Sequence, residues 1–110
     1  MSIDRSAIGG LSAHAFAAIR NVLAQHPAIE RAILFGSRAK GNYKNGSDID
    51  LALAGPVGFS ELGKIAGEID DLLLPWEIDL LAYESITNQD LRDHIQRVGQ
   101  LFYTRLENAA

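Results

Sequence analysis

The chain has 110 residues, the length of one domain, and we expect residues 1–110 to form a single domain around one modest core. Its apolar fraction of 47% and charged fraction of 22% argue against disorder, and the absence of cysteine excludes disulfides, thiolate metal sites and a thiol nucleophile. The net charge of −4 argues against direct nucleic-acid binding. Neither a membrane-spanning stretch nor a signal-peptide pattern is present, so we expect a cytoplasmic protein without a membrane partner.

The first half of the chain predicts one helix and two strands. The helix, over about residues 11–25, is predicted from apolar residues spaced three or four apart: Phe16, Ile19, Val22 and Leu23. The apolar run 29–35 predicts a strand that ends in a turn at Gly36. Residues 47–53 predict a second strand.

The second half predicts helix, strand and helix. The first of these helices begins with Ser60 as its cap and ends before Pro75, and residues 76–83 predict a third strand. The last helix is predicted over about 88–106, with Thr87 and Asp90 at capping-box spacing. Its apolar face would consist of Leu91, Ile95, Val98 and Phe102. This order predicts an α+β fold, a small mixed β-sheet with helices packed over it in a second layer.

Two aspartates interrupt the apolar run of the second predicted strand. Asp48 and Asp50 are two residues apart, and side chains two apart along a strand project from the same face. Neighbouring ionised carboxylates repel each other unless a cation lies between them. Hard oxygen ligands without cysteine favour Mg²⁺, with Mn²⁺ as the alternative, over zinc.

The turn after the first predicted strand has the composition of a phosphate-binding loop. Gly36 allows a ligand to approach the backbone, and Ser37 adds a hydroxyl donor at the start of a short helical turn. A phosphate site beside a carboxylate metal site is the arrangement for nucleoside triphosphate chemistry.

A third carboxylate would complete such a site, and the third predicted strand offers two. Glu77 and Asp79 are also two residues apart and share a face, so either can reach the cluster. We prefer Asp79 because it lies nearer the middle of the strand. Its expected role is general base or ligand of a second metal ion.

The spacing of these residues resembles a known signature. Gly36-Ser37, ten residues, and then Asp48-x-Asp50 is similar to the motif of the polymerase-beta-type nucleotidyltransferase superfamily. The surrounding "FGSRAKG" and "SDIDLAL" resemble, more narrowly, the minimal nucleotidyltransferases (MNT proteins) of bacteria and archaea. The likeness extends over nearly the whole chain.

The resemblance implies specific roles for these residues. Asp48, Asp50 and Asp79 would be catalytic and would hold two Mg²⁺ ions, while Gly36 and Ser37 would bind the phosphates of ATP. Arg38 and Lys40 follow in the motif and would also contact the nucleotide, unless they belong only to a solvated basic loop. His14, His26 and His94 lack ligand spacing, and we expect them at the surface or at helix ends.

The resemblance also implies a partner. MNT proteins resemble antitoxins encoded with small helical HEPN-domain proteins, and the implied reaction is transfer of AMP from ATP to a tyrosine of that partner within a hetero-oligomer. Two alternatives stay open: an antitoxin that neutralises its partner by occlusion without catalysis, and a nucleotidyltransferase with a small-molecule acceptor.

Overall fold

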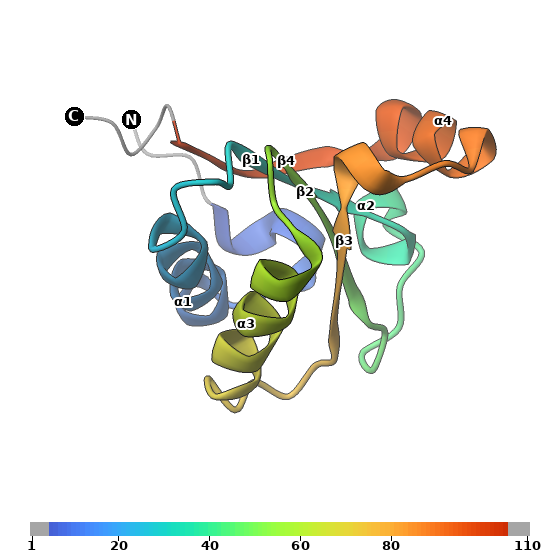
Figure 1. The fold of residues 1–110 in the computed structure, drawn as a ribbon. Helices are drawn as coiled ribbons and strands as arrows, with labels where there is room; N and C mark the ends of the chain where they lie inside the picture. The colour runs from blue at the N-terminus through green and yellow to red at the C-terminus, as the bar shows by residue number, and fades with distance from the viewer. Residues whose placement is uncertain (1–4, 106–110) are drawn as a thin grey trace.

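The computed structural model describes residues 5–105, in which helices cover both faces of a four-stranded sheet (Figure 1). The helical elements are η1 (Arg5–Gly10), α1 (Ala13–Ala24), α2 (Ser37–Lys40), α3 (Phe59–Asp70), η2 (Tyr83–Ser85) and α4 (Gln89–Val98). The strands are β1 (Arg31–Phe35), β2 (Ile49–Ala54), β3 (Ile78–Ala82) and β4 (Gln100–Thr104). The predicted α+β fold with a mixed sheet is confirmed, but the helices form a layer on each face of the sheet and not the single second layer that was predicted.

The sheet has the order β3-β2-β1-β4. Strand β1 pairs antiparallel with β2 and β4, whereas β2 pairs parallel with β3. The parallel pair requires a crossover connection, and α3 supplies it. In the strand order, β3 forms one edge of the sheet and β4 the other.

The two faces of the sheet are covered unequally. Helices α1 and α3 lie side by side on one face, and α4 lies on the other (Figure 1). Side chains along β2 point alternately to the two faces. Ile49, Leu51 and Leu53 belong to the main core on the side of α1 and α3, whereas Ala52 packs with Ile95 of α4 on the other side. The second face therefore has a small core of its own, which leaves room for polar residues at its end.

The predicted last helix is wrong in its second half. Helix α4 ends at Val98, and residues 100–104 form β4, in which Phe102 is fully buried against the main core. Gly99 marks the change, since its backbone is extended and a Cβ there would collide with the carbonyl of Ile95. Leu106, the predicted end of that helix, lies outside the described residues.

The helix caps also differ from the predictions. Asn88, not Thr87, caps α4, because its side chain accepts a hydrogen bond of 3.1 Å from the N–H of Leu91. Gly58 is the residue before α3, so Ser60 lies inside that helix. In the part of the chain that the structure describes, no helix has the length and apolar character needed to cross a bilayer.

Candidate active site

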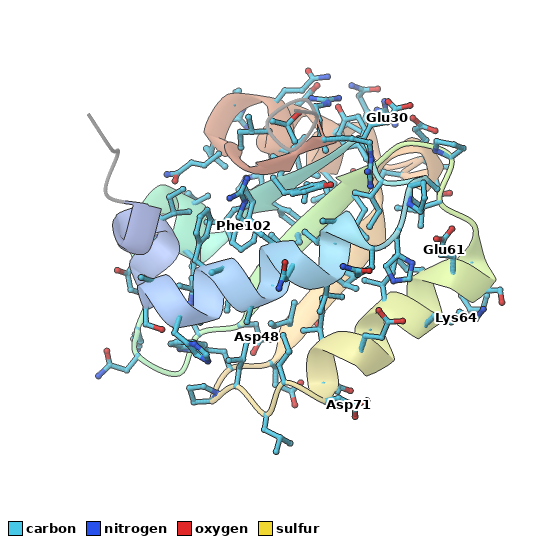
Figure 2. All side chains as sticks on the ribbon, turned by 90° about the vertical axis from the view of Figure 1, so that its left-hand side faces the viewer. Glu30, Asp48, Glu61, Lys64, Asp71 and Phe102 are labelled. Carbon is cyan, nitrogen blue, oxygen red and sulfur yellow. The ribbon has the colours of Figure 1, made fainter. Side chains whose placement is uncertain are left out.

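The three predicted carboxylates come from the ends of two neighbouring strands. Asp48 directly precedes β2, and Asp50 is the second residue of that strand. In the parallel pairing Asp50 lies opposite Asp79 of β3, and Glu77 directly precedes that strand. Ala52, two residues after Asp50, packs toward α4, so Asp50 projects from the same face. Figure 2 shows Asp48 at this end of the sheet.

The environment of Asp50 disfavours its ionised form. Burial raises the pKa of this carboxyl above its ordinary value, and the charges of Asp79 and Asp48 together with a hydrogen bond to Asp79 raise it further. Asp50 is half-buried, whereas Asp48 and Asp79 are exposed. Mutual repulsion of three carboxylates at one strand end gives the site an affinity for positive charge.

The Gly36 backbone is shaped by its contact with Asp50. Phe35, the last residue of β1, lies opposite Asp50 in the antiparallel pairing, and Gly36 follows with a φ of +76°. A Cβ at Gly36 would collide with the Asp50 carboxylate. Only glycine therefore permits this turn, which leads into Ser37, the first residue of α2.

His94 reaches the site from α4, although its place in the sequence predicts only a surface or helix-end position. The N–H of Gly36 donates a 3.2 Å hydrogen bond to Nε2 of His94, whose ring also meets the Phe35 ring edge-on at 6.3 Å. An accepting Nε2 requires the neutral tautomer with the proton on Nδ1. No local pattern in the sequence indicates this contact, which depends on how α4 packs against the sheet at the buried Ile95.

Arg38 has a different environment from the one predicted. The side chain is buried, at 3% exposure, and its guanidinium donates to the carbonyls of Gly9, Ser47 and Asn45 at 2.6, 3.0 and 3.1 Å. It also lies over the Tyr43 ring, at 4.6 Å from the centroid. Arg38 is thus not part of a solvated basic loop, and its hydrogen bonds hold the loop that leads to Asp48. Lys40 is exposed at the end of α2.

The three carboxylates fit a divalent cation by their chemistry. All three are hard, anionic oxygen donors, and a cation would counteract both the burial and the neighbouring charges that raise the pKa of Asp50. Among the described residues, no three His, Cys, Asp or Glu side chains already form a metal-ligand group. Asp48, Asp50 and Asp79 would therefore have to rotate toward a common point to hold an ion.

The chain is similar in sequence to a known protein. The "Probable protein adenylyltransferase MntA" of Haemophilus influenzae is 38% identical over 66 residues, which cover 58% of this chain and 57% of that protein. The chain thus spans a little over half the length of that relative.

Solved structures share the fold at low sequence identity. A toxin–antitoxin crystal structure with AMP-PNP superposes with a TM-score of 0.68 at 21% identity, covering 84% of this chain and 76% of that chain. A putative nucleotidyltransferase of Sulfolobus solfataricus gives 0.55 at 19% identity, covering 97% and 95%. The sequence model of the family "Polymerase beta, Nucleotidyltransferase" matches residues 17–108. The chain belongs to this polymerase beta nucleotidyltransferase family.

Proposed function

We propose that the protein is a Mg²⁺-dependent adenylyltransferase that moves AMP from ATP to a tyrosine hydroxyl of a HEPN-type partner protein and so acts as its antitoxin. The observation that carries the proposal is the grouping of Asp48, Asp50 and Asp79 at one end of the sheet, beside the Gly36 turn. These are the parts that nucleotidyl transfer needs, namely a carboxylate cluster for cations and backbone donors for phosphate.

The relatives support the choice of reaction and partner. The Haemophilus influenzae relative is a probable protein adenylyltransferase. One structural neighbour, with a TM-score of 0.62 at 19% identity over 86% of this chain and 75% of that chain, comes from the complex of a tri-AMPylated Shewanella oneidensis HEPN toxin with MNT antitoxin. An adenylylated protein in that complex makes a protein hydroxyl the first acceptor to test here.

The transfer step is a displacement at the α-phosphorus of ATP. The acceptor oxygen forms a bond to this phosphorus while the bond to the β-phosphate bridging oxygen breaks, so that pyrophosphate leaves. Asp79 is exposed at the strand edge and takes the role of base that accepts the hydroxyl proton. The N–H of Gly36 and the hydroxyl of Ser37 would donate to phosphate oxygens, for which the Gly36 N–H must leave His94.

Asp48, Asp50 and Asp79 are the residues that would hold Mg²⁺, with Mn²⁺ as an alternative. When bound, the cations would neutralise the phosphate oxygens and the charge that develops on the leaving group. Asp50 is the least exposed of the three carboxylates, and its side chain forms a hydrogen bond with Asp79 of the neighbouring strand β3.

Intact-mass spectrometry of a HEPN-type partner from the same genome tests the proposal. The partner is incubated with this protein, MgCl₂ and each nucleoside triphosphate in turn. The matched variants are Asp48→Asn with Asp50→Asn, and Asp90→Asn in the first turn of α4 as the control.

We expect a gain of one or more AMP units with ATP, which the double variant abolishes and Asp90→Asn leaves intact. A complex that forms without any mass gain, and a double variant that still neutralises the partner, would overturn the proposal in favour of occlusion. Transfer to a small hydroxyl compound but not to the partner would instead overturn the choice of acceptor.

A further inference from the structure

Within residues 5–105 no strand pairs with the outer edge of β3, which is therefore available for pairing with another chain. This strand contains Ile78, Leu80, Leu81 and Ala82, without the Lys or Pro that commonly protects an edge strand. The N–H of Ile49 donates to the carbonyl of Glu77, so Glu77 and Asp79 direct their backbone groups toward β2. By alternation, Ile78, Leu80 and Ala82 direct theirs outward.

Three hollows follow this edge and share wall residues, and we call them together the β3 groove. The middle hollow, of about 540 Å³, lies between α3 and β3 and is lined by Phe59, Leu62, Gly63 and Asp79, among others. It shares Leu62 with a hollow of about 360 Å³ that extends to the start of α4. Phe59 is 92% exposed, so an apolar side chain stands at the wall without a partner in the described chain.

The third hollow gives the groove an acidic end. It holds about 430 Å³, shares Ala66 and Ile78 with the middle hollow, and contains Asp70 and Glu77. The groove is thus apolar beside Leu80 and negatively charged before Ile78. An occupant with apolar residues followed by a basic residue complements both parts.

We propose that an extended segment of the acceptor protein adds to the sheet along the edge of β3, with apolar side chains on the α3 wall and an Arg or Lys beside Asp70 and Glu77. This inference rests on the proposed function, because it places the acceptor hydroxyl at Asp79, which lines both the groove and the carboxylate cluster. Main-chain hydrogen bonds would supply affinity, and the pockets for alternate side chains would supply specificity.

Charge argues against a second copy of this chain as the occupant. Antiparallel pairing of two β3 edges would bring Glu77 and Asp79 of one copy near the same strand of the other, in a protein with a net charge of −4. A basic acceptor segment would instead be attracted by Asp70 and Glu77, and we therefore assign the groove to the acceptor.

Labelled nine-residue peptides test the docking without nucleotide, by fluorescence anisotropy with the full chain. Each peptide has Val at alternate positions and a central Tyr, and ends in Arg, Gln or Glu. We expect the Arg peptide to bind at least tenfold more tightly than the Glu peptide, and Asp70→Lys with Glu77→Lys to reverse this order. Equal binding of the three peptides, or no binding, would overturn the proposal.

Two glycines of α3 provide matched variants for the groove itself. A Cβ at Gly63 or at Gly67 meets nothing within 4 Å, so a large side chain is accommodated at either position, but only Gly63 lines the middle hollow. Gly63→Trp should weaken peptide binding at least tenfold and Gly67→Trp should not. The proposal fails if both variants bind like the wild type.

N-methylated peptides separate strand addition from other modes of binding. Alternate amides of an added strand point toward β3 and away from it. Methylation of the amides that point toward β3 should abolish binding, because it removes their hydrogen bonds, whereas methylation of the other amides should be tolerated. Equal effects of the two sets would overturn strand addition.

Transfer measurements with ATP distinguish the groove from the proposed function. A peptide that binds as expected but gains no AMP would leave the groove standing and count against the transferase. If Gly63→Trp leaves AMP transfer to the HEPN-type partner unchanged, this result would support the transferase and count against the groove.

Discussion

Asp50 combines burial with two neighbouring carboxylates, and its ionisation therefore has a cost for the folded chain. Its pKa is higher in the folded than in the unfolded state, so the cost is absent below the unfolded pKa, grows as pH rises between the two values and is complete above the folded pKa. Asp50→Asn should raise the free energy of unfolding of the metal-free protein at neutral pH by up to about 1 kcal/mol, the size of a side-chain pair on adjacent strands. Urea denaturation in EDTA measures this gain.

The same substitution should abolish AMP transfer, so stability and activity would change in opposite directions. Asp90→Asn is the control, because Asp90 is exposed in the first turn of α4, where its charge is favourable. A loss of stability for Asp50→Asn as large as that for Asp90→Asn would contradict the repulsion that we assign to the site.

Gly36 and Gly41 allow the contact with Asp50 to be measured apart from backbone strain. Both have positive φ, of 76° and 87°, but a Cβ at Gly36 would collide with Asp50, whereas a Cβ at Gly41 meets nothing within 4 Å. Gly41→Ala should cost only the strain of about 1–2 kcal/mol, with AMP transfer retained. Gly36→Ala should cost more in thermal unfolding and abolish transfer, and equal costs for the two variants would contradict the contact.

At the scale of elements, His26 connects the end of α1 to α3. Its Nδ1 lies 3.0 Å from Glu61 and its Nε2 lies 2.8 Å from Glu68, and Glu61 faces the end of α1 (Figure 2). Burial lowers the pKa of His26, but the hydrogen bonds to Glu68 and Glu61 and their charges outweigh it, so the net pKa lies above its ordinary value of 6.5. The connection is therefore strongest when His26 is protonated.

Stability should consequently fall as pH rises through the folded pKa of His26. The contribution is complete below the unfolded pKa of about 6.5, and raising the pH above the folded value should remove about 0.5–1 kcal/mol, because both glutamates are partly exposed. Denaturation midpoints across this range measure the loss. His26→Gln should remove this pH dependence, whereas His14→Gln, on the exposed face of α1, should keep it.

The boundary between α4 and β4 shows why one element was predicted wrongly. Ile95, Val98 and Phe102 are three or four apart, which fits a continuous helix, but Phe102 reaches the opposite face of the sheet through a strand. The spacing of the apolar residues cannot distinguish a continuous helix from a helix followed by a strand. The strand forms because residues 100–104 pair with the edge of β1, a contact that lies far away in the sequence. Gly99 and the strand-favouring residues Phe102, Tyr103 and Thr104 were the local signals.

At the scale of the whole molecule, the candidate site divides into parts that a sequence can and cannot predict. Strand alternation and the family motif are enough to predict that Asp48, Asp50 and Asp79 lie close together. Asp48 directly precedes β2, Asp50 lies in β2, and Asp79 lies in the neighbouring strand β3. The positions of His94 and Arg38 depend on how distant segments pack, because His94 is 58 residues from Gly36 in sequence and Gly9 is 29 residues from Arg38. No local pattern encodes those contacts.

Arg38 joins the N-terminal segment to the loop before β2, and its replacement should therefore affect stability before it affects chemistry. Arg38→Lys removes the planar donors that meet the carbonyls of Gly9, Ser47 and Asn45, each a hydrogen bond to a charged group. We expect a loss of about 3 kcal/mol in the free energy of unfolding without nucleotide, and weaker ATP binding because Asp48 loses its support. Lys40→Met, at an exposed position on the same short helix, should retain wild-type stability. Wild-type stability of Arg38→Lys together with weakened ATP binding would instead show that the guanidinium contacts the nucleotide directly, as the family motif had suggested.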